Sequence, residues 1–182
     1  DAVFALHQAA PLVEGLDAPA AMASVLAGNL RAARAAGLPE TAIAPLEAAL
    51  QAALTRCAPA LTARAAEGRI RRCHGDLHLA NLCLWQGKPT PFDALEFDEG
   101  LARIDTGYDL AFLLMDLDQQ AGRAAANRVL NRYLARSGDY GLLAPLPLWL
   151  ALRALVRAHV QAARGRDGAP LLRAAIDYLA PP

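Results

Sequence analysis

Three residues with oxygen-bearing side chains lie in the middle of the chain and could do chemistry as a set. Asp76 follows His74 by two positions, Asn81 follows Asp76 by five, and Asp93 comes twelve residues after Asn81. Magnesium prefers oxygen ligands and keeps several waters, so one carboxylate and one amide can hold it beside phosphate oxygens. A carboxylate beside an attacking hydroxyl can orient that hydroxyl and take its proton. The residue types therefore suit a magnesium site with a general base, in which Asp76 is the candidate base and Asn81 and Asp93 are candidate magnesium ligands.

These side chains can meet only if the chain between them folds back on itself. Residues 82–85 and 90–92 are short apolar runs that flank the sequence Gln-Gly-Lys-Pro, which is typical of the turn of a β-hairpin. A hairpin would return Asp93 to the neighbourhood of Asn81. We therefore expect three oxygen donors to face one site.

Helices are expected on both sides of this segment. Residues 1–69 are rich in alanine, leucine and arginine, which favour helices, and are interrupted at 11–15, 37–39 and 58–59. After the hairpin, helical periodicity starts at Asp105 and continues over roughly 122–136, 146–164 and 169–179. The sequence thus predicts one mainly α domain with a small β-hairpin: 1–69 helical, 70–98 loop and hairpin, and 99–182 helical.

Composition excludes several classes of protein. The 182 residues are 55% hydrophobic and 20% charged, which argues against disorder. Eighteen basic and eighteen acidic side chains cancel, so there is no overall positive field for nucleic acid or an anionic membrane. No apolar run is long enough to span a bilayer, and three cysteines do not form a dense disulfide framework. We expect a cytoplasmic protein.

Local charge is far less balanced than total charge. Between residues 74 and 118, nine acidic side chains stand against Lys88 and Arg103, which gives a local net charge of −7 and leaves +7 for the remainder. Focused negative potential attracts cations, so this region is suited to magnesium and to a cationic substrate such as a polyamine or an amino-sugar.

Three motifs in order make a more specific pattern. The His-x-Asp-x4-Asn spacing at 74–81 is that of the protein-kinase catalytic loop. Together with 92–97 (Phe-Asp-Ala-Leu-Glu-Phe) and 105–111 (Asp-Thr-Gly-Tyr-Asp-Leu-Ala), the sequence resembles the aminoglycoside phosphotransferase family of the kinase-like fold. The resemblance is strongest to a branch often fused to a P-loop ATP-binding domain, and its motifs cover about 45 residues.

The resemblance implies a kinase-like C-terminal lobe that uses ATP and magnesium to phosphorylate a hydroxyl of a small molecule, aminoglycoside-like or other. It also implies roles for particular residues. In the catalytic loop, Asp76 would be the base and His74 its structural companion, while Asn81 and Asp93 would bind the cofactor through magnesium. Three further residues would support the site: His78, Glu96 and Asp109, the last as a buried carboxylate beneath the catalytic loop. Family members usually have Asp-Phe-Glu where this chain has Asp-Ala-Leu-Glu at 93–96, which leaves the role of Glu96 open.

A nucleotide-binding lobe is not recognisable in the sequence. Kinase-type enzymes grip ATP with a loop over the phosphates and a lysine, whereas this chain has one lysine, Lys88, in the hairpin turn, and no glycine-rich phosphate loop. We therefore expect the chain to be a fragment of a longer enzyme. Its partners would be a missing N-terminal lobe and a fused P-loop domain.

Simpler interpretations exist for the same residues. Asp76, Asn81 and Asp93 could be helix caps and turn residues, and Asp109 could cap the helix that it opens. A metal-dependent hydrolase would instead use zinc bound by Cys73, His74, His78 and Cys83. The chain could also be a kinase-like module that binds a ligand or partner without turnover.

Overall fold

The computed structural model describes residues 1–95 and 99–180. Contacts divide the chain into two compact units, and each unit is assembled from two stretches of sequence. Unit 1 comprises Asp1–Leu16 and Ala63–Leu143, and unit 2 comprises Asp17–Thr62 and Ala144–Pro182. The predicted site residues fall within unit 1. That all 182 residues act as one lobe stays a prediction.

Unit 2 is helical. Its elements are α2 (Ala18–Ala35), most of α3 (Glu40–Ala66), α7 (Leu146–Ala163) and α8 (Ala169–Leu179), and α7 packs against both α2 and α8. Asp17 caps α2, because its side chain accepts a hydrogen bond from the amide of Ala20 at 3.0 Å. The bounds of α7 and α8 confirm the helices predicted at 146–164 and 169–179.

The break predicted at 58–59 is wrong. Helix α3 runs through both Pro45 and Pro59 without interruption. A proline inside a helix costs about 3 kcal/mol because it removes a hydrogen bond and crowds the preceding turn. Here the helix also buries an apolar face at helical spacing, which offsets that cost. The buried residues are Ile43, Leu46, Leu50, Ala53 and Leu61.

Unit 1 combines helices with two small antiparallel sheets. In chain order it contains α1 (Ala2–Ala9), β1 (Ile70–Arg72), the 3-10 helix η1 (Leu79–Asn81), β2 (Leu82–Trp85), β3 (Lys88–Pro91), α4 (Glu99–Ala102), β4 (Arg103–Asp105), α5 (Thr106–Ala121), α6 (Arg123–Ser137) and η2 (Tyr140–Leu143). Strand β1 pairs with β4, Ile70 opposite Asp105. This second sheet was not predicted, because strands of three residues carry almost no periodicity.

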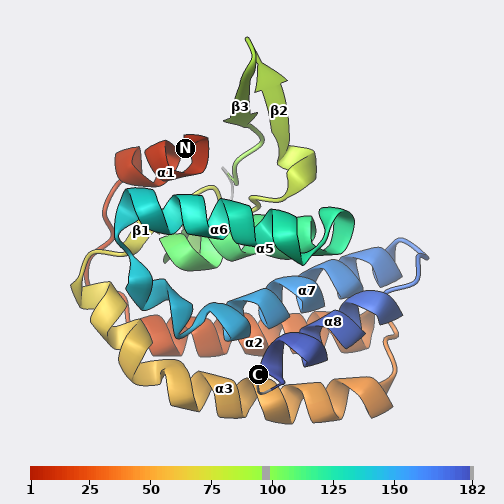
Figure 1. Cartoon of the computed structure of the whole chain (residues 1–182). Coiled ribbons are helices and arrows are strands. Elements are labelled where there is room, and N and C mark those ends of the chain that lie inside the picture. The colour runs from red at the N-terminus through yellow and green to blue at the C-terminus, as the bar shows by residue number, and fades with distance from the viewer. Residues whose placement is uncertain (96–98, 181–182) are drawn as a thin grey trace. The chain divides into compact units, whose positions relative to one another are not determined.

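The predicted hairpin is confirmed. Strands β2 and β3 pair antiparallel across the two-residue turn Gln86-Gly87, with Leu84 opposite Pro89 and Leu82 opposite Pro91. Figure 1 shows the hairpin extending away from α5 and α6. Leu84 and Trp85 are accordingly exposed, at 76% and 65%.

Helix α5 begins where β4 ends. Asp105, the last residue of β4, is the N-cap of α5, because its Oδ1 accepts a hydrogen bond from the amide of Gly107 at 2.7 Å. The helix is buried from Thr106 through Asp116. Helix α6 confirms the helix predicted at 122–136. The chain is therefore mainly α with a small hairpin, and none of the helices within the described ranges is long and apolar enough to cross a membrane.

Candidate active site

The loop of residues 74–81, which we call the catalytic loop after the kinase loop whose spacing it shares, brings Asp76 and Asn81 together. The Asn81 Nδ2 donates to the backbone oxygen of Asp76 at 2.9 Å and to its Oδ2 at 3.1 Å. Asn81 is buried, whereas the side chain of Asp76 is 38% exposed. The side-chain amide of Asn81 therefore holds the Asp76 carboxylate, which remains accessible to solvent.

Asp93 lies on a turn that is fastened to the same loop. The amide of Phe92 donates to the Asn81 carbonyl at 3.0 Å, and the His74 carbonyl accepts from the amide of Leu95 at 3.0 Å. Asp93 is exposed and has a positive φ of 61°, a conformation that aspartate tolerates better than most residues. The hairpin thus returns the backbone of Asp93 to the loop that carries Asp76 and Asn81.

His74 links the two segments through its ring as well as its backbone. Its Nε2 donates to the Phe92 carbonyl at 2.9 Å, so the ring carries its proton on Nε2. The residue is buried. His74 therefore acts on the site by connecting the catalytic loop to the turn that carries Asp93.

Asp109 supports the catalytic loop from below. It is fully buried in the first turn of α5 and accepts from the amides of His74 (Oδ2, 3.1 Å) and Gly75 (Oδ1, 2.9 Å). The interpretation of Asp109 as a helix cap is wrong, because Asp105 is the N-cap of α5. A second carboxylate on α5, that of Asp116, accepts from the amide of Leu79 at 2.9 Å. One helix therefore holds both ends of the loop.

Gly75 is required by the shape of the loop. Its φ is +81°, and a Cβ at this position would lie 2.7 Å from Leu95 Cδ1 and 3.1 Å from the Leu101 carbonyl oxygen. A larger residue would push the loop away from the turn that follows Asp93. The glycine thus allows the close approach that the site needs.

Sequence reasoning missed His7, which joins Asp109 from a helix 102 residues away. The His7 Nε2 lies 3.1 Å from Asp109 Oδ2, and its Nδ1 lies 2.8 Å from the hydroxyl of Tyr133. Burial raises the pKa of Tyr133 well above its usual value, which keeps this hydroxyl protonated. A single histidine in an alanine-rich helix gives no signal of such a contact. Asp116 could have been found, because seven residues separate it from Asp109 on one face of α5.

A buried ion cluster fixes the start of α5. Arg64 Nε and Nη2 bond to both oxygens of Asp105 at 2.7 Å, and its Nη1 and Nη2 bond to Asp139 at 2.6 and 2.9 Å. All three side chains are buried. Burial by itself lowers the pKa of Arg64, but the two carboxylates raise it further than burial lowers it. The cluster joins the end of α3, the N-cap of α5 and the segment after α6.

His78 lies beside Asp76. Its Nε2 is 3.4 Å from Asp76 Oδ2, and its side chain is 12% exposed. The ring meets Phe112 edge-on, with centroids 5.3 Å apart and an interplanar angle of 72°. Glu96, the other predicted supporting residue beside Asp109, lies outside the described residues.

The zinc interpretation is wrong. In the part of the chain that the structure describes, the one group of three residues whose candidate ligand atoms lie within 4.8 Å of one another is His7, Cys73 and Asp109. His74, His78 and Cys83 do not join it. The atoms of this group already take part in hydrogen bonds, including one from Cys73 Sγ to the Ile104 carbonyl. The group is a hydrogen-bonded part of the scaffold.

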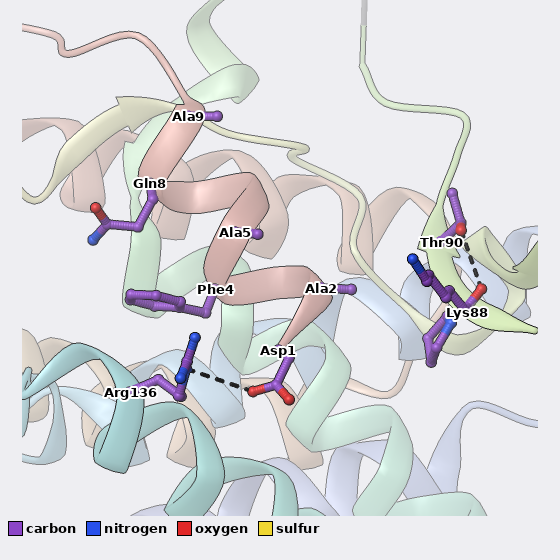
Figure 2. A pocket seen from close by; sticks show the side chains of 10 residues that line it. Asp1, Ala2, Phe4, Ala5, Gln8, Ala9, Lys88, Thr90 and Arg136 are labelled. Atoms are coloured by element: carbon purple, nitrogen blue, oxygen red, sulfur yellow. Dashed lines mark hydrogen bonds and ion pairs between the residues drawn. The ribbon is translucent and has the colours of Figure 1, made fainter.

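A groove of about 860 Å³ lies in unit 1 between α1, β3 and α6 (Figure 2). On its rim, the Arg136 guanidinium lies over the Phe4 ring at 5.7 Å and 3.7 Å from an Asp1 carboxylate oxygen. None of the three predicted oxygen donors lines it. The lining residues are Asp1, Ala2, Phe4, Ala5, Gln8, Ala9, Lys88, Pro89, Thr90 and Arg136.

Comparison with known proteins agrees with this geometry. The model of the phosphotransferase enzyme family APH matches residues 1–146. The chain belongs to this family. The fold is thus that of a kinase-like C-terminal lobe, and the catalytic loop, the hairpin and α5 all lie within the matched part.

The curated relatives of the chain give no information about the substrate. Uncharacterized proteins of Mycobacterium tuberculosis and Mycobacterium bovis are 36% identical to the chain over 107 residues. The match covers 59% of this chain and 22% of each relative, so the chain spans about a fifth of their length. No solved structure matches the chain.

Proposed function

We propose that the protein is the C-terminal lobe of a phosphotransferase that uses ATP and magnesium to phosphorylate a hydroxyl group of a small molecule. The observation that carries this proposal is the half-exposed carboxylate of Asp76, held by Asn81 on a loop whose backbone is anchored to buried Asp109. Membership of the phosphotransferase family supports the reaction class.

Asp76 would act as the general base. As the substrate oxygen attacks the γ-phosphorus, an O–P bond forms, the bond from phosphorus to the leaving ADP oxygen breaks, and the hydroxyl proton moves to the Asp76 carboxylate. Asn81 donates to one oxygen of this carboxylate, which limits its rotation. The transition state for phosphoryl transfer is loose. The protein therefore has mainly to position the reacting groups and to compensate the negative charge of the transferred phosphoryl group.

The side chains present fit a magnesium ion. Asn81 directs its Nδ2 to Asp76, so its Oδ1 is the end that could ligate a metal, and Asp93 supplies an exposed carboxylate from the adjoining turn. Both are hard oxygen donors of the kind that magnesium selects. Magnesium, when bound, would neutralise charge on the transferred phosphoryl group.

Another part of the full-length protein would bind ATP. The relatives are several times longer than the match, which supports a nucleotide lobe elsewhere in a longer protein. The negative charge of residues 74–118 supports a cationic substrate, aminoglycoside-like or other.

The test is phosphate transfer by the full-length protein in which Asp76 is replaced by asparagine. We expect kcat to fall about 100-fold or more, because general-base catalysis typically contributes 10²- to 10⁴-fold. Asp177→Asn, the same change at an exposed position of α8, is the matched control and should leave transfer unchanged.

Unaltered turnover in Asp76→Asn would reject the proposal. Ligand binding without any magnesium-dependent transfer in the intact protein would instead favour a binding module. Asn81→Ala and Asp93→Asn should both raise the magnesium concentration needed for half-maximal rate.

A further inference from the structure

We propose that His78 is a positioning residue. Its Nε2–H donates a hydrogen bond to Asp76 Oδ2 and so holds the Asp76 carboxylate in place. The inference rests on the proposed function, in which Asp76 is the base. It assigns a task to the second histidine of the catalytic loop that the motif alone does not specify.

The geometry brings one hydrogen-bond donor and one nearby ring nitrogen to the same carboxylate oxygen. Asp76 Oδ2 lies 3.1 Å from Asn81 Nδ2 and 3.4 Å from His78 Nε2. An ionised carboxylate only accepts hydrogen bonds, so the histidine must carry a proton on the nitrogen that faces it. Asn81 already donates to this oxygen, and a hydrogen bond from His78 Nε2–H would be the second that fixes the plane of the carboxylate and the direction of its other oxygen.

The far side of the imidazole supports this tautomer. His78 Nδ1 is buried and has no hydrogen-bond partner among the residues that the structure describes. A proton there would be a buried donor without an acceptor, which is more costly than placing it on Nε2 beside a carboxylate. His78 therefore carries the proton on Nε2, the nitrogen that faces Asp76.

The imidazole is held in place on two sides. Its ring packs edge-on against Phe112 of α5. The backbone beside it is anchored because the amide of Leu79 donates to Asp116, also on α5. The same helix thus orients His78 and, through Asp109, the start of the catalytic loop.

The decisive readout is the tautomer of His78, measured by 15N NMR at neutral pH on the full-length protein. We expect a protonated Nε2 and an unprotonated Nδ1, with the Nε2 resonance shifted in Asp76→Asn. A proton on Nδ1 alone, or no response to Asp76→Asn, would overturn the proposal. This measurement does not require activity, so it is independent of whether the proposed function holds.

Kinetics then separate positioning from stability. His78→Leu removes the donor. We expect kcat to fall about 10- to 100-fold, because one hydrogen bond to a charged group contributes about that factor. The KM should change by no more than about twofold. His78→Gln places an amide N–H near the position of Nε2 and should recover most of the rate. His159→Gln in unit 2 is the matched control and should match the wild-type rate. Equal kcat in His78→Leu and wild type, or equal losses in His78→Leu and His78→Gln, would contradict the role.

Discussion

Unit 1 and unit 2 bury different kinds of side chain. Among the residues that the structure describes, every buried polar or charged side chain except Arg153 lies in unit 1. Those of unit 1 are His7, Arg64, His74, Asn81, Asp105, Thr106, Asp109, Asp116 and Asp139. Unit 2 is held mainly by leucine, alanine and Trp149. Burying polar groups costs free energy unless they are paired, so the buried polar side chains of unit 1 are fixed in position by their hydrogen bonds and ion pairs.

The difference shows how the site works. Apolar packing tolerates small shifts between side chains, whereas a hydrogen bond is weakened by a shift of a few tenths of an ångström. The loop that carries Asp76 is fixed because three of its amides donate hydrogen bonds to the carboxylates of Asp109 and Asp116. The accessible carboxylates therefore rest on a buried polar framework, and the following changes test it.

The largest effect is expected at Arg64. Arg64→Met leaves the buried carboxylates of Asp105 and Asp139 without their main partner, and should lower the free energy of unfolding by about 3–5 kcal/mol in chemical denaturation. The control is Arg34→Met in unit 2, which breaks partly exposed pairs with Glu40 and Glu47 and should cost less than about 1 kcal/mol. Similar losses in both variants would remove the distinction between the units.

A smaller effect is expected at His7. His7→Met removes a donor to Asp109 and a contact with Tyr133, and should cost about 1–3 kcal/mol in free energy of unfolding. Amide hydrogen exchange should become faster at His74 and Gly75, which Asp109 holds. The amide of Leu79 serves as the internal control because Asp116 holds it. Equal acceleration at all three amides would indicate general loosening instead.

The smallest effect is a pH dependence in unit 2. Burial lowers the pKa of His159 below its ordinary value of 6.5. The unfolded chain therefore takes up a proton first as the pH falls, so stability is complete above pH 6.5 and declines as the pH drops through the lowered value. The fall in thermal midpoint between pH 7.5 and pH 5 should be smaller in His159→Gln, and an identical fall would exclude this source.

Short sequence patterns were enough to predict much of the fold. The hairpin follows from a short turn between apolar runs, and the helices after Asp105 follow from leucines at one-face spacing. The failures have tertiary causes. Pro59 looks like a break because the buried face of α3 is not visible locally. Trp85, the last residue of the apolar run 82–85, is exposed because the hairpin extends from unit 1.

The candidate site also contains residues that local sequence predicts and residues that only the tertiary structure shows. Asp76, Asn81 and Asp93 were found because their spacing is confined to about twenty residues of sequence. The hydrogen bond that joins His7 to Asp109 spans 102 residues, and the cluster around Arg64 connects α3 to Asp105 and Asp139. Such contacts are determined by how helices pack, and a single sequence contains no pattern that reports them.

The two prolines of β3 affect whether the edge of this strand can pair with a strand of another molecule. Beside a two-residue turn, Trp85 and Lys88 form a hydrogen-bonded pair, so Pro89 and Pro91 occupy positions whose nitrogens point away from β2. Proline has no N–H, and an incoming strand from another molecule would find no donors there. An apolar, exposed hairpin invites edge-to-edge aggregation, and the prolines of β3 close that route along the β3 edge.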